Sequence, residues 1–156
     1  MNVLDNVAAG AIAAGGATSV KDARAQAMQQ LEFAGLTALA NNPASSLTLA
    51  MRKRLELAKS LAMNPRLLLL DEVNAGLNAT EIDQALKLVR EISARGVTIL
   101  LVEHLMKVVL SLCTRIVVLH HGKLIAQGTP DQVIRDPVVV QAYLGRRYAD
   151  AERTNV

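Results

Sequence analysis

Two carboxylates follow a short run of leucines in the middle of the chain. The run covers residues 67–70, and Asp71 and Glu72 come directly after it. Such a run is typical of a strand buried on both faces of a parallel sheet, although leucine also favours a short buried helix. A carboxylate at the end of such a strand lies where α/β sheets bind ligands. Asp71 is therefore a candidate Mg²⁺ ligand, acting through water, and Glu72 a candidate to polarise an attacking water. A strand followed by an acidic turn without function explains the pattern equally well.

A histidine follows the next apolar run. Residues 97–102 are mostly β-branched and uninterrupted, which indicates a second strand, and His104 comes just past its end. Because parallel strands end at the same sheet edge, we expect His104 near Glu72, where an imidazole can bond a phosphate oxygen or orient a water. By itself, His104 is more simply a helix-start residue. His120 and His121 follow another strand, and no carboxylate or cysteine completes a metal-binding spacing with the histidines.

The elements around these residues alternate between helices and strands. Apolar periodicity, capping residues and breakers predict helices over 22–39, from Ser45 or Ser46 to Met63, over 79–95, over 104–112, from Pro130, and from Pro137 to about Leu144. Further strands are expected over 115–119 and 124–127, on either side of a turn at His121-Gly122. Residues 1–20 show no firm period, and 146–156 read as a frayed polar tail. The order predicts an α/β fold, a parallel sheet flanked by helices.

Composition excludes several classes of protein. The net charge is only +3, with 17 basic and 14 acidic residues, and the aromatic residues are limited to Phe33, Tyr143 and Tyr148. Single-strand nucleic-acid binders stack bases on aromatic side chains, so no nucleic-acid partner is expected. No apolar run approaches the roughly 18 residues of a membrane span. The amino terminus has no basic region of the kind that signal peptides carry.

The single cysteine points to a reducing compartment. Cys113 has no partner for an internal disulfide, and its neighbours Leu110, Leu112 and Ile116 favour packing as a small hydrophobe. We therefore expect a cytoplasmic protein without direct membrane insertion, which meets a membrane only through a partner.

Together, these segments resemble the ATPase subunits of ABC transporters. Asp71-Glu72 with its leucines looks like their Walker B motif, residues 74–78 (NAGLN) look like their D-loop, and residues 102–104 (VEH) look like their switch-histidine segment. Residues 47–51 (LTLAM), followed by the basic run 52–54, stand where the signature loop of the family lies. The combination is specific, whereas no single motif is.

The resemblance is greatest to the branched-chain amino-acid uptake group. That group shares the stretches DExxAGLN and VEH-x-MKVV and an ending like GTPDQVIRDP…QAYLG, which here covers residues 128–145. The likeness extends over most of 31–145, and residues 1–7 look like the stretch after the family's Q-loop. It implies a truncated P-loop NTPase (ABC ATPase) fold. The implied regions are a helical, signature-bearing region (1–64), an α/β core with Walker B, D-loop and switch histidine (65–128), and carboxyl-terminal helices and tail (129–156).

The resemblance also implies a role for each matched residue. Glu72 would be the catalytic base, His104 the catalytic γ-phosphate sensor, and Asp71 the ligand of the Mg²⁺ site. The positions that would bind nucleotide are Thr48, Leu49, Ala50, Met51, Gly76, Leu77 and Asn78. Of these, Thr48 and its neighbours would complete the opposite protomer's site. The implied cofactors are ATP and Mg²⁺. The implied partners are transmembrane permease subunits and a second ABC ATPase subunit, in a homo- or heterodimer on the cytoplasmic face of the inner membrane.

Three departures from the family pattern limit the roles that the resemblance implies for this chain. No G-x-x-x-x-G-K-[ST] loop (Walker A) occurs in the sequence, so the chain has no nest of N–H groups and no lysine for the β- and γ-phosphates. The signature keeps the hydroxyl of Thr48 but replaces small or polar positions by Leu49, Ala50 and Met51. Val73 stands where the family commonly has proline after Walker B. We expect no useful ATP affinity and no hydrolysis by this chain alone.

Three functions remain open at this point. The chain is either part of an ATP-hydrolysing importer subunit, or a non-catalytic pseudo-ATPase that docks on a permease or an intact ATPase, or an unstable remnant with an unpaired strand edge. In the signature segment, a helix start whose basic cluster is merely solvated is the alternative to phosphate binding. The transported substrate is not readable from this chain.

Overall fold

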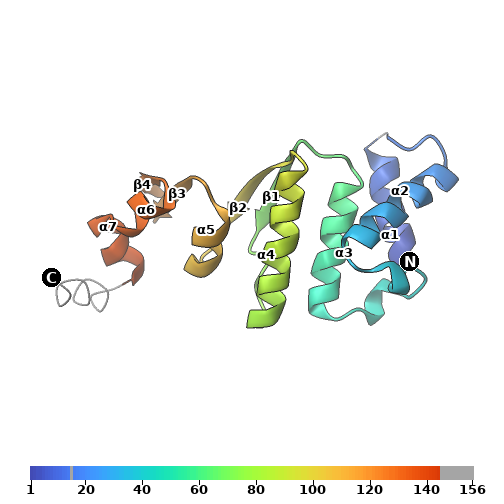
Figure 1. The fold of residues 1–156 in the computed structure, drawn as a ribbon, viewed down its shortest axis with the longest axis horizontal. Helices are drawn as coiled ribbons and strands as arrows, with labels where there is room; N and C mark the ends of the chain where they lie inside the picture. Colours follow the sequence, from blue (N-terminus) through green and yellow to red (C-terminus); the bar gives the residue numbers. More distant parts are fainter. Residues whose placement is uncertain (15, 145–156) are drawn as a thin grey trace. The chain divides into compact units, whose positions relative to one another are not determined.

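The computed structural model describes residues 1–14 and 16–144, arranged as two compact units, Met1–Val102 and a second unit that begins at Glu103 (Figure 1). The tail predicted over 146–156 lies outside the described residues. Among the residues described, no helix is long and apolar enough to cross a membrane. The predicted region boundaries after 64 and 128 stay predictions.

The first unit opens with three packed helices, α1 (Val3–Ala13), α2 (Val20–Phe33) and α3 (Leu49–Leu61). Their inward side chains have no exposed surface: Val3, Val7, Ala11, Ala23, Ala27, Leu31 and Ala58. Many of these residues are alanines, and small side chains let helices approach closely. At Gly10 the approach is so close that an added Cβ would lie 2.4 Å from the Lys59 carbonyl oxygen. The helical region therefore has a closed core of its own.

Two sequence predictions in this region need correction. The first helix was missed because an Ala- and Gly-rich segment gives no contrast between its faces. The helix predicted over 22–39 stops at Phe33, where Gly35 adopts φ +70 and the Leu36 amide donates to the Leu31 carbonyl at 2.8 Å. This is how a glycine-terminated helix closes. Short 3₁₀ turns follow over Thr37–Leu39 and Ala44–Ser46.

The cap of α3 is Thr48 and not the predicted Ser45 or Ser46. The Thr48 hydroxyl accepts a hydrogen bond from the Met51 amide at 3.3 Å. Ser46 belongs to the preceding 3₁₀ turn, where its hydroxyl donates to the Pro43 carbonyl at 2.7 Å. The extended backbone at Thr48 is the conformation that an N-cap requires.

A two-stranded parallel sheet completes the first unit. β1 (Leu67–Asp71) pairs with β2 (Thr98–Val102), and α4 (Ala79–Ala94) connects them and lies beside the sheet (Figure 1). Both strands and their parallel pairing agree with the sequence prediction. The expected burial on both faces is wrong: Leu68 and Leu70 are buried, but Leu67 and Leu69 are more than half exposed. One face of the sheet has no cover within this unit.

The second unit contains a hairpin and short helices. α5 (Met106–Leu112) precedes β3 (Ile116–His120) and β4 (Lys123–Gly128), which pair antiparallel. His121 and Gly122 form the turn, both with positive φ, as the tightest hairpins require. α6 (Pro130–Ile134), α7 (Pro137–Val139) and a π-helical turn (Val140–Leu144) follow. A small core is made by Ile116, Val118, Val133 and Val139.

Cys113 packs against that small core, as the sequence predicted. Burial raises the pKa of the Cys113 thiol above its ordinary value, because desolvation disfavours the thiolate. The residue therefore behaves as a small apolar side chain near neutral pH.

Candidate functional site

The two predicted carboxylates lie at the carboxyl end of β1. Asp71 is the last residue of the strand, its Cα pairs with that of Val102, and its side chain is exposed. The Glu72 amide donates to the Val102 carbonyl at 2.9 Å, so the contact with β2 continues one residue past the strand. Both carboxylates thus emerge from the sheet edge at which α/β proteins bind ligands.

Glu72 has an uncommon backbone conformation. Its φ is +45, in the left-handed region that residues other than glycine, asparagine and aspartate seldom adopt. Two hydrogen bonds to its carbonyl oxygen hold this turn: the Ala75 amide at 3.0 Å and the Lys53 ammonium at 3.4 Å. Backbone conformations of this kind concentrate at functional sites. No local pattern predicts the Lys53 contact, because it joins residues on separate elements.

The loop after Glu72 contacts the start of α3. Gly76 has φ +78, and an added Cβ there would lie 2.9 Å from Leu49 Cδ2. Asn74 is buried, and its carbonyl accepts the Leu77 amide at 3.2 Å. The loop ends at Asn78, which caps α4. The structure therefore brings together two groups of predicted site residues, the signature-like and the D-loop-like segments.

Asn78 and Glu81 form the capping box that their spacing predicted. The Asn78 side chain accepts the Glu81 amide at 3.0 Å, and the Glu81 carboxylate accepts the Asn78 amide at 2.9 Å. The reciprocal pair satisfies two of the amides that a helix start leaves open. This fixes the exit of the loop onto α4.

The basic run beside the signature-like segment is not simply solvated. Arg52 Nε donates to the Leu47 carbonyl at 3.1 Å, Lys53 donates to the Glu72 carbonyl, and Arg54 Nη2 donates to Gln84 Oε1 at 2.5 Å. Leu49 and Met51 are exposed on the first turn of α3. The run therefore ties α3 to the loop after β1 and to α4, while the helix start itself faces outward.

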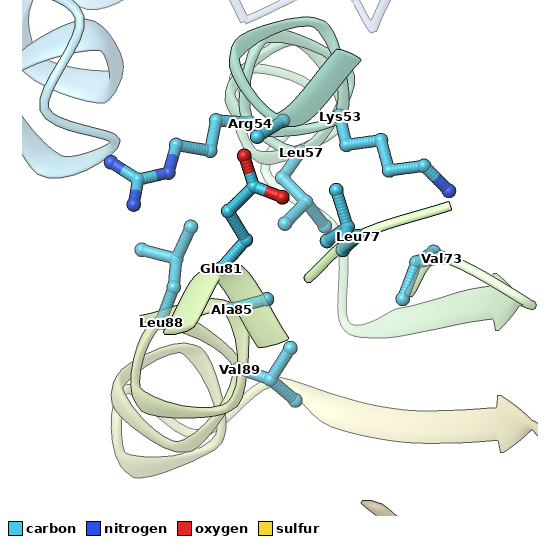
Figure 2. Close-up of a pocket in the computed structure, with 10 residues that line it drawn as sticks. Lys53, Arg54, Leu57, Val73, Leu77, Glu81, Ala85, Leu88 and Val89 are labelled. Carbon is cyan, nitrogen blue, oxygen red and sulfur yellow. The ribbon is translucent and has the colours of Figure 1, made fainter. Parts of the chain in front are cut away.

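A narrow pocket lies between α3 and α4 (Figure 2). Glu81 points from the start of α4 toward α3, with Lys53 and Arg54 extending to either side of it (Figure 2). The lining also includes Ala50 and Leu77 among the predicted site residues. Its volume of about 20 Å³ is room for about one water molecule. The pocket is a small gap in the packing of the two helices, and it is too small for a nucleotide.

His104 belongs to the second unit. It is exposed and lies between the end of β2 and the start of α5. Its meeting with Asp71 and Glu72 stays a prediction. His120 and His121 lie at the hairpin turn with ring centroids 4.2 Å apart. Within 1–14 and 16–144, no three His, Cys, Asp or Glu side chains are grouped to hold a metal ion.

The family whose description is "ABC transporter" matches residues 1–75, and "Branched-chain amino acid ATP-binding cassette transporter" matches residues 123–149. Among solved structures, the ADP conformation of an ATP-binding cassette of an ABC transporter is 28% identical with a TM-score of 0.79, over 94% of this chain and 63% of that one. CbiO1 from Clostridium perfringens is 26% identical with a TM-score of 0.78, over 99% of this chain and 61% of that one. Fold and strand-end carboxylates thus define a partial α/β ABC ATPase domain.

Curated relatives narrow the group. The chain is 42% identical over 128 residues to the "High-affinity branched-chain amino acid transport ATP-binding protein BraF" of Pseudomonas aeruginosa, covering 81% of this chain and 50% of BraF. LivG of Escherichia coli K12, with the same description, is 42% identical over 74% of this chain and 46% of LivG. LptB of Acidithiobacillus ferridurans, a lipopolysaccharide export ATP-binding protein, is 38% identical over 77% of this chain and 50% of LptB. The chain belongs to the ABC-transporter ATP-binding proteins of the branched-chain amino-acid group, and it spans about half the length of these relatives.

The family implies ATP and Mg²⁺, and the described residues fit only part of that requirement. Mg²⁺ takes one or two carboxylates and otherwise keeps waters and phosphate oxygens, so exposed Asp71 at a strand end suits it without a dedicated cage. The outward-facing start of α3 suits an anion, because a helix N-terminus offers open N–H groups. The lysine and glycine loop for the remaining phosphates has no counterpart in the sequence.

Proposed function

We propose that the chain is the carboxyl-terminal part of the ATP-hydrolysing subunit of an ABC importer for branched-chain amino acids or related small solutes. One observation carries the proposal: Asp71 and Glu72 stand at the carboxyl end of β1, and the Glu72 backbone is held by both β2 and Lys53. A fixed backbone suits a residue that must aim its carboxylate at a water. The identity to BraF supports the substrate class.

Each carboxylate has a distinct role in the proposal. Asp71 holds Mg²⁺ through water, and Glu72 accepts a proton from the attacking water. Asp71 is the last residue of β1, whereas Glu72 has a left-handed backbone, so we expect the two side chains to project in different directions and not to compete for one position. His104 contacts the γ-phosphate. Chain connectivity supports that assignment, since two residues span at most about 7 Å and His104 is two residues beyond Val102, the partner of Asp71.

The start of α3 serves the site of a second ATPase subunit. Thr48, Leu49, Ala50 and Met51 form the first turn, which is exposed or half-exposed. The Thr48 hydroxyl accepts from the Met51 amide and so keeps its own proton available for a phosphate oxygen. Gly76 lies against that turn at Leu49, and Leu77 and Asn78, which follow Gly76 directly, complete the proposed nucleotide-binding segment. The proposed partners are therefore a second ABC ATPase subunit and transmembrane permease subunits at the cytoplasmic face of the inner membrane.

A second candidate function is a pseudo-ATPase that docks without catalysis. The altered signature favours it, because Leu49 and Met51 present apolar side chains where an anion would approach. Dimerisation and permease docking need neither hydrolysis nor a phosphate-binding loop.

A chimera separates the two functions. This chain replaces the matched half of BraF, so that the other half of BraF supplies the phosphate-binding loop that its family carries. We expect ATP hydrolysis, and we expect Glu72→Gln to lower the rate at least about 100-fold, the contribution typical of a positioned base, while nucleotide binding persists. Glu56→Gln, on the exposed side of α3, is the matched control.

The outcomes are distinct. A chimera that binds ATP and shows no turnover, with or without Glu72, contradicts the catalytic function and leaves the docking function. Titration calorimetry of the chain alone with millimolar ATP should give no heat, with or without Mg²⁺. Tight binding there would show that the missing loop is not required.

A further inference from the structure

The carbonyl oxygen of Glu72 accepts hydrogen bonds from donors of two kinds. The Ala75 amide donates to it at 3.0 Å, through a backbone bond that does not depend on a side chain. The Lys53 ammonium donates to it at 3.4 Å from a separate element, α3. Of these two donors, the ammonium is the one that a substitution removes. Lys53 is therefore the residue through which the sequence of α3 acts on this turn.

α3 meets the loop after β1 at two points on one face of the helix. Leu49 and Lys53 are four residues apart in α3, so they are neighbours on its surface. Leu49 Cδ2 lies where a Cβ added to Gly76 would approach it to 2.9 Å, and Lys53 Nζ reaches the Glu72 carbonyl. Figure 2 shows Lys53 extending from α3 toward the side on which Val73 lies. The lysine contact thus belongs to a wider interface between helix and loop.

The hydrogen bond from Lys53 is long, but its donor carries a charge. A typical N–H···O bond measures about 2.9–3.0 Å, and the attraction between a charge and a carbonyl dipole persists somewhat beyond that distance. Lys53 is partly exposed, and it lines the gap beside Val73 and Leu77. Because solvent screens such a contact, we expect loss of the ammonium to have a moderate effect and to leave the fold intact.

The conformation at Glu72 is one that glutamate does not favour by itself. Its φ is +45, and residues in such conformations remain there where the surrounding structure holds them. The backbone sets the direction of the Cα–Cβ bond, so a turn that relaxed to negative φ would redirect the whole side chain. A general base must lie within hydrogen-bond reach of the proton that it accepts. The position of the carboxylate therefore depends on what stabilises the turn.

We propose that Lys53 is a positioning residue for ATP hydrolysis, which stabilises the left-handed backbone of Glu72 and so keeps the carboxylate directed at the attacking water. The inference rests on the proposed function for the role of Glu72. Lys53 acts through a backbone oxygen of its own chain. Its contribution is therefore expected in kcat and not in the KM for ATP.

The full chain tests whether Lys53 stabilises the turn. Lys53→Met keeps most of the apolar stem and removes the ammonium, whereas Lys53→Arg keeps a charged donor. In NMR hydrogen exchange, Lys53→Met should speed exchange of the Ala75 amide at least about threefold, because local opening becomes easier. Lys53→Arg should restore most of the protection. Lys87→Met removes an equal charge on α4, where the lysine side chain is 80% exposed, and should leave the Ala75 amide unchanged.

The BraF chimera tests whether the turn matters for hydrolysis. Lys53→Met should lower kcat about three- to tenfold and leave the KM for ATP within about twofold of the parent. Lys53→Arg should recover most of kcat, and Lys87→Met should match the parent. All variants are assayed well below their unfolding midpoints, measured by circular dichroism, so that loss of folded protein does not account for a lower rate.

The outcomes separate this inference from the proposed function. An unchanged Ala75 exchange rate in Lys53→Met, or an unchanged kcat in an active chimera, would overturn the positioning role. A raised KM with an unchanged kcat would assign Lys53 to nucleotide binding instead, and a loss of kcat that Lys53→Arg does not restore would assign the effect to the stem. A chimera that is inactive with the parent sequence contradicts the proposed function, and the exchange rates then still decide whether Lys53 stabilises the turn.

Discussion

The three helices of the first unit bury their apolar side chains more completely than the sheet that follows them. In α1–α3, the inward residues have no exposed surface. In β1 and β2, every second residue of each strand is exposed, although the leucines and valine there are as apolar as the helix core. A helix buries its stripe against sequence neighbours, whereas a parallel strand needs partners from distant parts of a chain. The helical region is therefore complete by itself, and the sheet is not.

The largest expected effect tests the closed side of this comparison. Leu31 has no exposed surface, so Leu31→Ala should lower the free energy of unfolding by about 2–5 kcal/mol. Leu69→Ala removes the same atoms from the exposed face of the β1–β2 sheet and should change the free energy of unfolding by less than about 0.5 kcal/mol. Urea denaturation followed by circular dichroism measures both. Equal effects would mean that the sheet face is buried in solution.

The closeness of the helices gives the next effect. Gly10→Ala places a methyl against the Lys59 carbonyl and should cost about 1–3 kcal/mol through displacement of α1 from α3. Gly16→Ala is the control, since the nearest atom to its added Cβ is 3.9 Å away. Thermal unfolding of the two variants distinguishes them. If Gly10→Ala left the stability unchanged, α1 and α3 could separate to make room for a methyl group at little cost.

The cap of α3 should have a smaller effect. Thr48→Ala removes the acceptor of the Met51 amide and should destabilise the first unit by about 1 kcal/mol, while Thr48→Ser should restore most of the loss. The same urea titration measures both variants. If both behave like the parent, the capping bond contributes nothing in solution.

The smallest effect concerns Cys113, which follows α5 and packs against the small core of the second unit. The pKa of the Cys113 thiol is raised in the folded chain, so folding favours the protonated thiol. The stability from this group is present below the unfolded pKa and is lost as pH rises through the folded pKa. Alkylation by iodoacetamide should therefore need higher pH in the native chain than in urea. Identical pH profiles would show that Cys113 is solvated.

Local signals predicted most elements and part of the site. The leucine run, the β-branched run and the capping box at Asn78 were readable, because each depends on neighbouring residues. The first helix was missed for lack of polar contrast, and the exposure of Leu67 and Leu69 was missed because composition does not reveal whether a partner is present. The Lys53 contact to Glu72 depends on tertiary packing. The position of His104 relative to Asp71 stays a prediction.

α3 makes two contacts that lie six residues apart along its length. Near its carboxyl end, Lys59 meets Gly10 of α1 without an intervening side chain, and nearer its start Lys53 holds the Glu72 carbonyl. Because one hydrogen-bonded helix makes both contacts, we expect a displacement of α1 to be transmitted along α3 to Lys53. The turn at Glu72 would then respond to a change at the first helix of the chain, with no change in the sheet itself.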